Sequence, residues 1–118
     1  MRAKQSVIVA ALALLSFYLL PSHGETVNVK YRGPVDLKSF ACNDISRSSF
    51  ITRVCYDRAE RYMIIRLNAI YYHYCELPPA ILRTFLDAPS MGSFYNQRIK
   101  GTGLDGPFDC RTHPVPEY

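Results

Sequence analysis

A chain of 118 residues is the size of one small domain, which excludes a multidomain enzyme. Its net charge is +4, but Arg2 and Lys4 supply two of these charges, and the rest of the chain carries 12 basic against 10 acidic residues. A balance of +2 fits an ordinary solvated surface, so charge alone does not point to a nucleic-acid partner.

The N-terminal residues have the layout of a secretory signal peptide. A short basic segment, Met1–Lys4, precedes an apolar run of 14 residues, Val7–Leu20, and the small residues Ser22 and Gly24 occupy positions −3 and −1 of a cleavage site. The run is shorter than the roughly 20 residues that a membrane-spanning helix needs. We therefore predict a signal peptide at 1–24 and a secreted or periplasmic protein with no stable membrane span after cleavage.

All four cysteines follow the predicted signal peptide: Cys42, Cys55, Cys75 and Cys110. An even number of cysteines in a small exported chain predicts two disulfides. A domain of this size has a marginal core, so cross-links that restrict the unfolded chain would add needed stability. The cysteines lack Cys-x-x-Cys spacing, and we expect neither a metal nor a cofactor.

Residues 25–49 form a leader segment ahead of the core. Apolar residues alternate from Glu25 to Tyr31, which predicts a short edge strand, and Gly33-Pro34 is typical of a turn. The stretch Val35–Asp44 has no firm period. Two of its side chains, Leu37 and Phe40, are expected to pack on the core.

The next segment predicts a three-stranded antiparallel meander with strands at Ser49–Asp57, Tyr62–Leu67 and Ile70–Cys75. The irregular spacing of apolar residues in the first strand indicates a β-bulge. The polar loop Asp57–Arg61 is predicted to be a solvated hairpin tip, and Asn68-Ala69 a tight connection.

Two short helices are expected after the strands. Pro78 or Pro79 suits the first position of a helix that runs to about Asp87, where one apolar stripe comprises Ile81, Leu82, Phe85 and Leu86. Ser90 is a suitable N-cap for a second helix, with Gly101 as its stop. Residues 102–118 are rich in Gly and Pro and predict an irregular tail tethered by Cys110.

The predicted fold is therefore α+β, a small three-stranded meander followed by two short helices packed on one face, with leader and tail tethered by disulfides. The period of two assigns the side chains to faces. The helix-covered face would carry Val54, Tyr56, Met63, Ile65, Leu67, Tyr72 and Tyr74. The opposite face would carry Arg53, Cys55, Tyr62, Ile64, Arg66, Tyr71, His73 and Cys75.

This assignment of faces restricts the disulfide pairing. Cys55 and Cys75 share a face but lie on the first and third strands, about 10 Å apart if the second strand separates them, which exceeds disulfide reach. Each would then pair with Cys42 or Cys110, and two connectivities stay open. In either one, the leader and the tail lie over the helix-free face.

The segment Ser48–Gly101 resembles the KTSC domain, a family named for a C-terminal appendage of some lysyl-tRNA synthetases. The matching residues are Ile51, Val54-Cys55-Tyr56-Asp57, Tyr72-His73-Tyr74, Leu77-Pro78, Leu86-Asp87-Ala88-Pro89-Ser90, Phe94-Tyr95-Asn96 and Ile99-Lys100-Gly101. The resemblance covers about half of the chain and defines a domain at 50–101. It implies a small strand meander followed by helix and no established activity, with RNA binding as a suggestion attached to the family.

The chain departs from that family in its predicted export signal, its leader and tail, and its cysteines. Cys55 stands where the family commonly has a small residue. An exported protein rarely meets tRNA, so these departures weaken an RNA role more than they weaken the expected fold.

The residues that we select as binding candidates combine rings and cations. The resemblance points to the Tyr72-His73-Tyr74 motif and Asn96, whereas Arg53, Arg66 and Tyr71 interleave charge and rings on the helix-free face, as single-stranded RNA would require. For each set there is a structural alternative. The motif tyrosines could fill the core, and the helix-free face could be covered by leader and tail.

Catalytic chemistry finds little support in the sequence. His73 and Cys75 could be read as a thiol–imidazole dyad, but no orienting third residue is evident and a disulfide would remove the nucleophile. We predict no enzyme. The first hypothesis is an exported binding or interaction module for a protein or envelope component; the alternative is an RNA-binding domain that uses the helix-free face.

Overall fold

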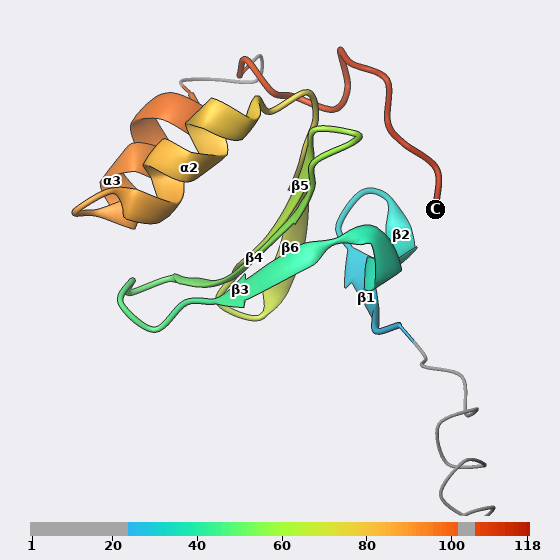
Figure 1. Cartoon of the computed structure of the whole chain (residues 1–118), viewed down its shortest axis with the longest axis horizontal. Helices are drawn as coiled ribbons and strands as arrows, with labels where there is room; N and C mark the ends of the chain where they lie inside the picture. The colour runs from blue at the N-terminus through green and yellow to red at the C-terminus, as the bar shows by residue number, and fades with distance from the viewer. Residues whose placement is uncertain (1–23, 102–105) are drawn as a thin grey trace, which may run out of the picture.

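The computed structural model describes residues 24–101 and 106–118 (Figure 1). The predicted signal peptide lies outside the described residues except for Gly24. Among the residues that are described, no helix is both long and apolar enough to cross a membrane.

The described chain is α+β and contains one curled, mixed sheet of six strands in the order β2-β1-β6-β5-β4-β3. The strands are β1 (Thr26–Val29), β2 (Gly33–Asp36), β3 (Ala41–Asp44), β4 (Ile51–Asp57), β5 (Tyr62–Leu67) and β6 (Ile70–Tyr74). Neighbouring strands are antiparallel except β1 and β6, which meet in a short parallel pairing at Val29 and Tyr71. The expectation of a three-stranded sheet was therefore wrong in strand number.

The predicted meander is present as β4, β5 and β6. Its second strand has the expected bounds, and the bulge expected in the first strand appears as a register shift between Ile51 and Arg53. Asn68 takes a positive φ of 56° in the tight turn before β6, a conformation that asparagine tolerates better than most residues. The hydrophobic pattern and the turn residues thus determined this part of the sheet.

The additional strands come from the leader segment. Gly33 and Pro34 begin β2 rather than form the turn, which lies at Lys30–Arg32 instead. A short 3₁₀ helix, Leu37–Ser39, then leads into β3. Val27 and Val29 of β1 alternate as predicted for a short strand, but β1 lies between β2 and β6 and not at the sheet edge. The strands β2 and β3 show no firm period, and their pairing with β1 and β4 is what makes them strands.

The helices follow the strands as expected. Helix α2 (Pro79–Asp87) starts with proline at its first position, and α3 (Met91–Phe94) has Ser90 as N-cap, whose hydroxyl oxygen accepts from the Ser93 amide. The helical path continues as a π-helical segment, η2 (Tyr95–Ile99), which the sequence did not reveal. Both helices pack on one face of the meander (Figure 1).

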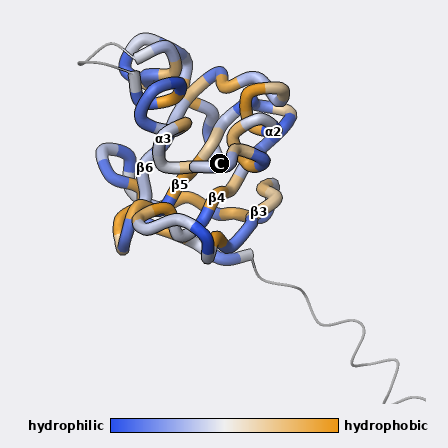
Figure 2. The backbone as a smooth tube through the Cα atoms, turned by 90° about the vertical axis from the view of Figure 1, so that its left-hand side faces the viewer, coloured by the Kyte–Doolittle hydropathy of each residue, from blue (hydrophilic) through white to orange (hydrophobic). Residues whose placement is uncertain are grey.

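The meander separates two hydrophobic cores. Burial on both faces favours runs of apolar residues, and Tyr62–Ile65 of β5 are buried without a break. Figure 2 shows hydrophobic stretches of chain at the strands. The core on the helix side consists of Ile51, Val54, Tyr56, Met63, Ile65, Leu77, Phe85, Met91, Tyr95 and Ile99. The core on the other side consists of Val27, Val29, Val35, Leu37, Cys55, Tyr62, Ile64 and Cys75, with Phe40 packed against it. The curled β1–β2 hairpin therefore covers the helix-free face.

Both disulfides respect the predicted exclusion of Cys55–Cys75. Cys42 bonds to Cys55 across the paired strands β3 and β4, and Cys75 bonds to Cys110 of the tail. The leader and the tail are thus each tethered to the meander.

One expectation about the tail-side loop was wrong. Asp57 was predicted to lie at a solvated hairpin tip, but only 6% of its surface is exposed. Its Oδ1 accepts from the Ala59 amide, and its Oδ2 accepts from the hydroxyl of Tyr118. The C-terminal tail passes over this loop and buries the carboxylate.

Candidate functional site

The arginines selected from the sequence are held inside a polar cluster with Tyr71. The guanidinium of Arg53 donates two bonds of 2.8 Å to Glu25, ahead of β1, and one of 3.2 Å to the hydroxyl of Tyr71. This pairing raises the pKa of Arg53 and lowers the pKa of Glu25. Only 16% of the Arg53 side chain is exposed. The ion pair links β4 to the residue just before β1 and so holds the two ends of the curled sheet together.

Arg66 is also engaged within the protein. Its Nε donates to the hydroxyl of Thr52 at 2.8 Å and its Nη1 donates to the hydroxyl of Tyr71 at 3.3 Å, with the guanidinium 5.5 Å from the Tyr71 ring centroid. Both arginines therefore donate hydrogen bonds to groups of the protein itself.

His73 is neutral and half-buried. Its Nδ1 lies 2.7 Å from the hydroxyl of Tyr62, and that hydroxyl also accepts a bond from Arg32. Burial lowers the pKa of His73, and the nearby charge of Arg32 lowers it further. Because Cys75 forms a disulfide, no thiol is available to pair with this imidazole.

The other candidates occupy different places. The Tyr74 hydroxyl lies 2.5 Å from that of Tyr95 on the helix side, and burial raises the pKa of Tyr74. Asn96 is exposed in the π-helical segment, apart from the rest. The set predicted from the sequence is thus divided among the closed face, the helix-side core and the outer surface.

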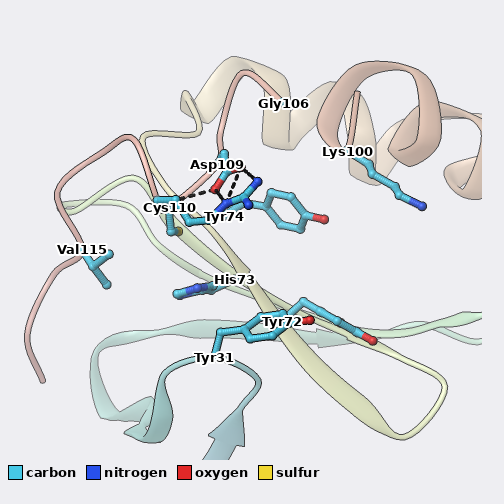
Figure 3. Close-up of a pocket in the computed structure, with 10 residues that line it drawn as sticks. Tyr31, Tyr72, His73, Tyr74, Lys100, Gly106, Asp109, Cys110 and Val115 are labelled. Atoms are coloured by element: carbon cyan, nitrogen blue, oxygen red, sulfur yellow. Dashed lines mark hydrogen bonds and ion pairs between the residues drawn. The ribbon is translucent and has the colours of Figure 1, made fainter. Parts of the chain in front are cut away.

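Three members of the set line one groove. They are Tyr72, His73 and Tyr74, which are consecutive residues of β6. The groove has a volume of about 600 Å³. Figure 3 shows Tyr31 and Tyr72 at one side and Asp109, Cys110 and Val115 at the other, with His73 between them. Its lining consists of Tyr31, Tyr72, His73, Tyr74, Lys100, Gly106, Asp109, Cys110, Arg111 and Val115.

Tyr31 is the functional candidate that sequence reasoning missed. It was assigned to an edge strand, but it lies in the β1–β2 turn with a positive φ of 69° and 86% of its surface exposed. The ammonium of Lys30 lies 5.3 Å from the Tyr31 ring centroid and 5.6 Å from that of Tyr72. An aromatic residue in the left-handed region costs free energy that its exposed ring does not recover by burial, and this makes Tyr31 a candidate for contact with a partner. The only signal in the sequence was the Gly33-Pro34 pair, which indicated a turn close to Tyr31.

The main chain of β6 has an open edge inside this groove. The two-residue turn at Asn68-Ala69 makes Leu67 and Ile70 a hydrogen-bonded pair, so that residues 71, 73 and 75 direct their main-chain groups away from β5. At this outer edge the Tyr71 carbonyl accepts from the Lys30 amide, and the Cys75 amide donates to the Phe108 carbonyl, each at 2.8 Å.

His73 lies between these two bonds. Its amide and carbonyl have no main-chain partner within 24–101 and 106–118, the ranges that the structure describes. The four residue steps from Tyr71 to Cys75 span about 13 Å at the rise of a strand. The gap therefore presents one unpaired donor and one unpaired acceptor beside aromatic rings.

The charges around the groove are partly compensated. Arg111 pairs with Asp109 at 2.5 Å and lowers the pKa of Asp109 to about 2. Lys30 adds a positive charge above the tyrosine rings, and Lys100 adds another to the lining. Within the described residues, no group of three or more His, Cys, Asp or Glu side chains could hold a metal ion.

Comparison with known proteins agrees with the resemblance found for Ser48–Gly101. Residues 47–102 match the family model of the KTSC domain. The chain is also similar to a KTSC domain protein from Yersinia pestis whose crystal structure is known. The two are 30% identical over 55% of this chain and 92% of that one, with a TM-score of 0.49. No curated protein matches the sequence.

Proposed function

The chain belongs to the KTSC domain family, and we propose that it is an exported, non-catalytic binding module that takes an extended peptide segment of a partner protein in the groove beside β6. The observation that carries this proposal is the main chain of His73, whose amide and carbonyl have no main-chain partner among the described residues. A sheet edge with free amide and carbonyl groups binds peptides by strand addition, and flanking pockets select their side chains.

The side chains of the groove support a peptide partner. Tyrosine rings with a nearby cation are typical of protein-binding hot spots, because they bury large areas at a low entropic cost. Tyr31 and Tyr72 present such rings, and Lys30 lies over both. Since Lys30 and Lys100 are positive, we expect a segment with acidic residues.

Export and the absence of catalysis are parts of the same proposal. Two disulfides persist only outside a reducing compartment, which supports a secreted or periplasmic location. The groove joins a neutral histidine, hydrogen-bonded tyrosines and a disulfide sulfur, and this set offers no activated nucleophile.

A blocked pentapeptide of alternating valine and glutamate tests the proposal by amide NMR on the full mature chain. We expect the His73 amide to shift and to gain protection from hydrogen exchange, because the added strand supplies its acceptor. The matched control is the same peptide N-methylated at alternate residues, which removes main-chain donors. Equal binding of both peptides, or an unchanged His73 amide, would contradict strand addition.

A pair of variants tests the role of the exposed ring. Replacing Tyr31→Ser should weaken binding of the acidic peptide by roughly tenfold, as expected for the loss of a hot-spot aromatic. Ile70→Ser is the control, because Ile70 is 46% exposed but does not line the groove. An equal effect of the two substitutions would place the peptide elsewhere.

The RNA alternative has less support because Arg53 and Arg66 bond to internal partners. Single-stranded RNA should therefore produce no salt-sensitive shift of the mature protein in a gel. A shift that disappears in the Arg53→Ala, Arg66→Ala double variant would favour RNA over a peptide.

A further inference from the structure

Four side chains from separate elements converge on Tyr118 of the tail, at a position distinct from the groove lining. They are Arg32 in the β1–β2 turn, Phe40 before β3, Asp57 at the end of β4 and Tyr62 at the start of β5. We call these four residues the tyrosine socket. It is assembled from both the leader and the meander.

The socket contacts each chemical group of the tyrosine. The Tyr118 ring stacks on Tyr62 with centroids 5.9 Å apart and tilts against Phe40 at 4.9 Å. The Arg32 guanidinium lies 5.4 Å from the ring centroid. The hydroxyl donates to Asp57 Oδ2 at 2.7 Å. Ring faces and hydroxyl are thus all matched by complementary groups.

The main chain before Tyr118 is bound as well. Arg32 Nη2 donates to the carbonyl oxygen of Pro116, two residues earlier. Arg32 therefore contacts both the ring of Tyr118 and the main-chain carbonyl of the residue two positions earlier. This contact fixes the main chain two residues before the tyrosine, whatever side chain that residue carries.

The walls of the socket are held by contacts independent of the tail. The Tyr62 hydroxyl bonds to both Arg32 and His73. Asp57 is fixed by the Ala59 amide. Such a site is preorganised, so an incoming segment would pay little to order it.

The occupant is held less firmly than the socket. The tail from Arg111 to Tyr118 contains no helix or strand, and 43% of the Tyr118 surface is exposed. Irregular surface segments with few buried contacts open locally at a small cost in free energy. We propose that the tyrosine socket is a recognition site for tyrosine-containing segments, whose main-chain carbonyl at the −2 position bonds to Arg32, and that the tail occupies it as a displaceable intramolecular ligand.

The chemistry of the socket also defines what it rejects. Burial and the bond to Asp57 raise the pKa of Tyr118, so the hydroxyl remains a proton donor. A phosphorylated tyrosine would place its negative charge against the Asp57 carboxylate. The socket therefore selects unmodified tyrosine.

The test uses the full mature chain with Tyr118→Ala and a fluorescent peptide of residues 112–118 with both ends blocked. In fluorescence polarisation, the peptide should bind Tyr118→Ala at least roughly tenfold more tightly than the wild type, because the tail of the wild type competes for the socket. Tyr118→Phe retains the ring and should fall between the two. Near-ultraviolet circular dichroism of each variant verifies that the fold is retained.

Two control peptides give the result its specificity. A peptide with alanine in place of the tyrosine and one with phosphotyrosine should both bind at least roughly tenfold more weakly to Tyr118→Ala. Equal affinity of the tail peptide for the wild type and for Tyr118→Ala would overturn the proposal. Equal affinity of Tyr118→Ala for the tyrosine and alanine peptides would overturn it as well. The strand-addition proposal is tested separately, with the acidic peptide and the amide of His73. A negative result with the tail peptide therefore does not count against strand addition.

Discussion

The two faces of the β4–β5–β6 meander are buried by different means. The helix side is covered by α2, α3 and η2, and all ten of its buried residues lie between Ile51 and Ile99. The opposite side is covered by the leader and the tail, which come from both ends of the described chain. The first face is closed by continuous local chain, whereas the second needs distant segments brought together.

This difference explains where the covalent and ionic links are found. Both disulfides and the Arg53–Glu25 ion pair join the meander to the leader or the tail. Short strands and an irregular tail bury little area, so cross-links offset the entropy of closing long loops. The helix side has no such link among the described residues and depends on side-chain packing.

The largest expected effect is at the helix-covered core. Phe85→Ala removes a fully buried ring of α2 and should lower the free energy of unfolding by about 3–5 kcal/mol. Urea denaturation followed by circular dichroism measures it. Arg83→Ala, on the exposed side of the same helix, should change stability by less than about 0.5 kcal/mol. Similar losses in both variants would show that packing does not dominate this face.

The loss of stability on removing a disulfide should increase with the number of residues in the loop that it closes. Replacing Cys75 and Cys110 by serine should cost about 4 kcal/mol, and replacing Cys42 and Cys55 about 3 kcal/mol, because the bridged residues are 35 and 13 positions apart. Denaturation of the two double variants checks the order. A reversed order would mean that local packing outweighs loop closure on this face.

The ion pair should contribute less than either disulfide. A double-mutant cycle with Arg53→Met and Glu25→Gln should give a coupling of about 1 kcal/mol, since Glu25 is 53% exposed and partly screened by water. The coupling should fall at high salt. A coupling of zero at low salt would remove the ion pair from the account of sheet closure.

The smallest expected effect is a pH dependence at His73. Its pKa is lowered in the folded protein by burial and then by Arg32, so the unfolded chain binds a proton more readily. Stability should therefore be full above about pH 6.5, the unfolded value, and decline as the pH falls below it. His73→Gln should flatten this decline in urea titrations, whereas His113→Gln in the tail should leave it in place.

The sequence alone was sufficient for much of the meander and the helices. The nearly continuous apolar run Tyr62–Leu67, the prolines before α2 and the Ser90 cap are local signals, and they indicated the correct elements. The predicted strand order, with the second strand between the first and third, separated Cys55 from Cys75 and excluded their pairing. These features depend on neighbours in the chain, so their physical causes are visible in the residue order.

Only the tertiary structure decided the fate of the leader, the tail and the groove. Val35 is a strand residue because β2 pairs with β1 in the curled sheet, and Asp57 was buried because Tyr118 reached it across the fold. Tyr31 and the open edge at His73 became neighbours through a single parallel pairing of β1 with β6. Contacts between segments so distant in the chain have no local signature, because they depend on how the whole chain excludes water.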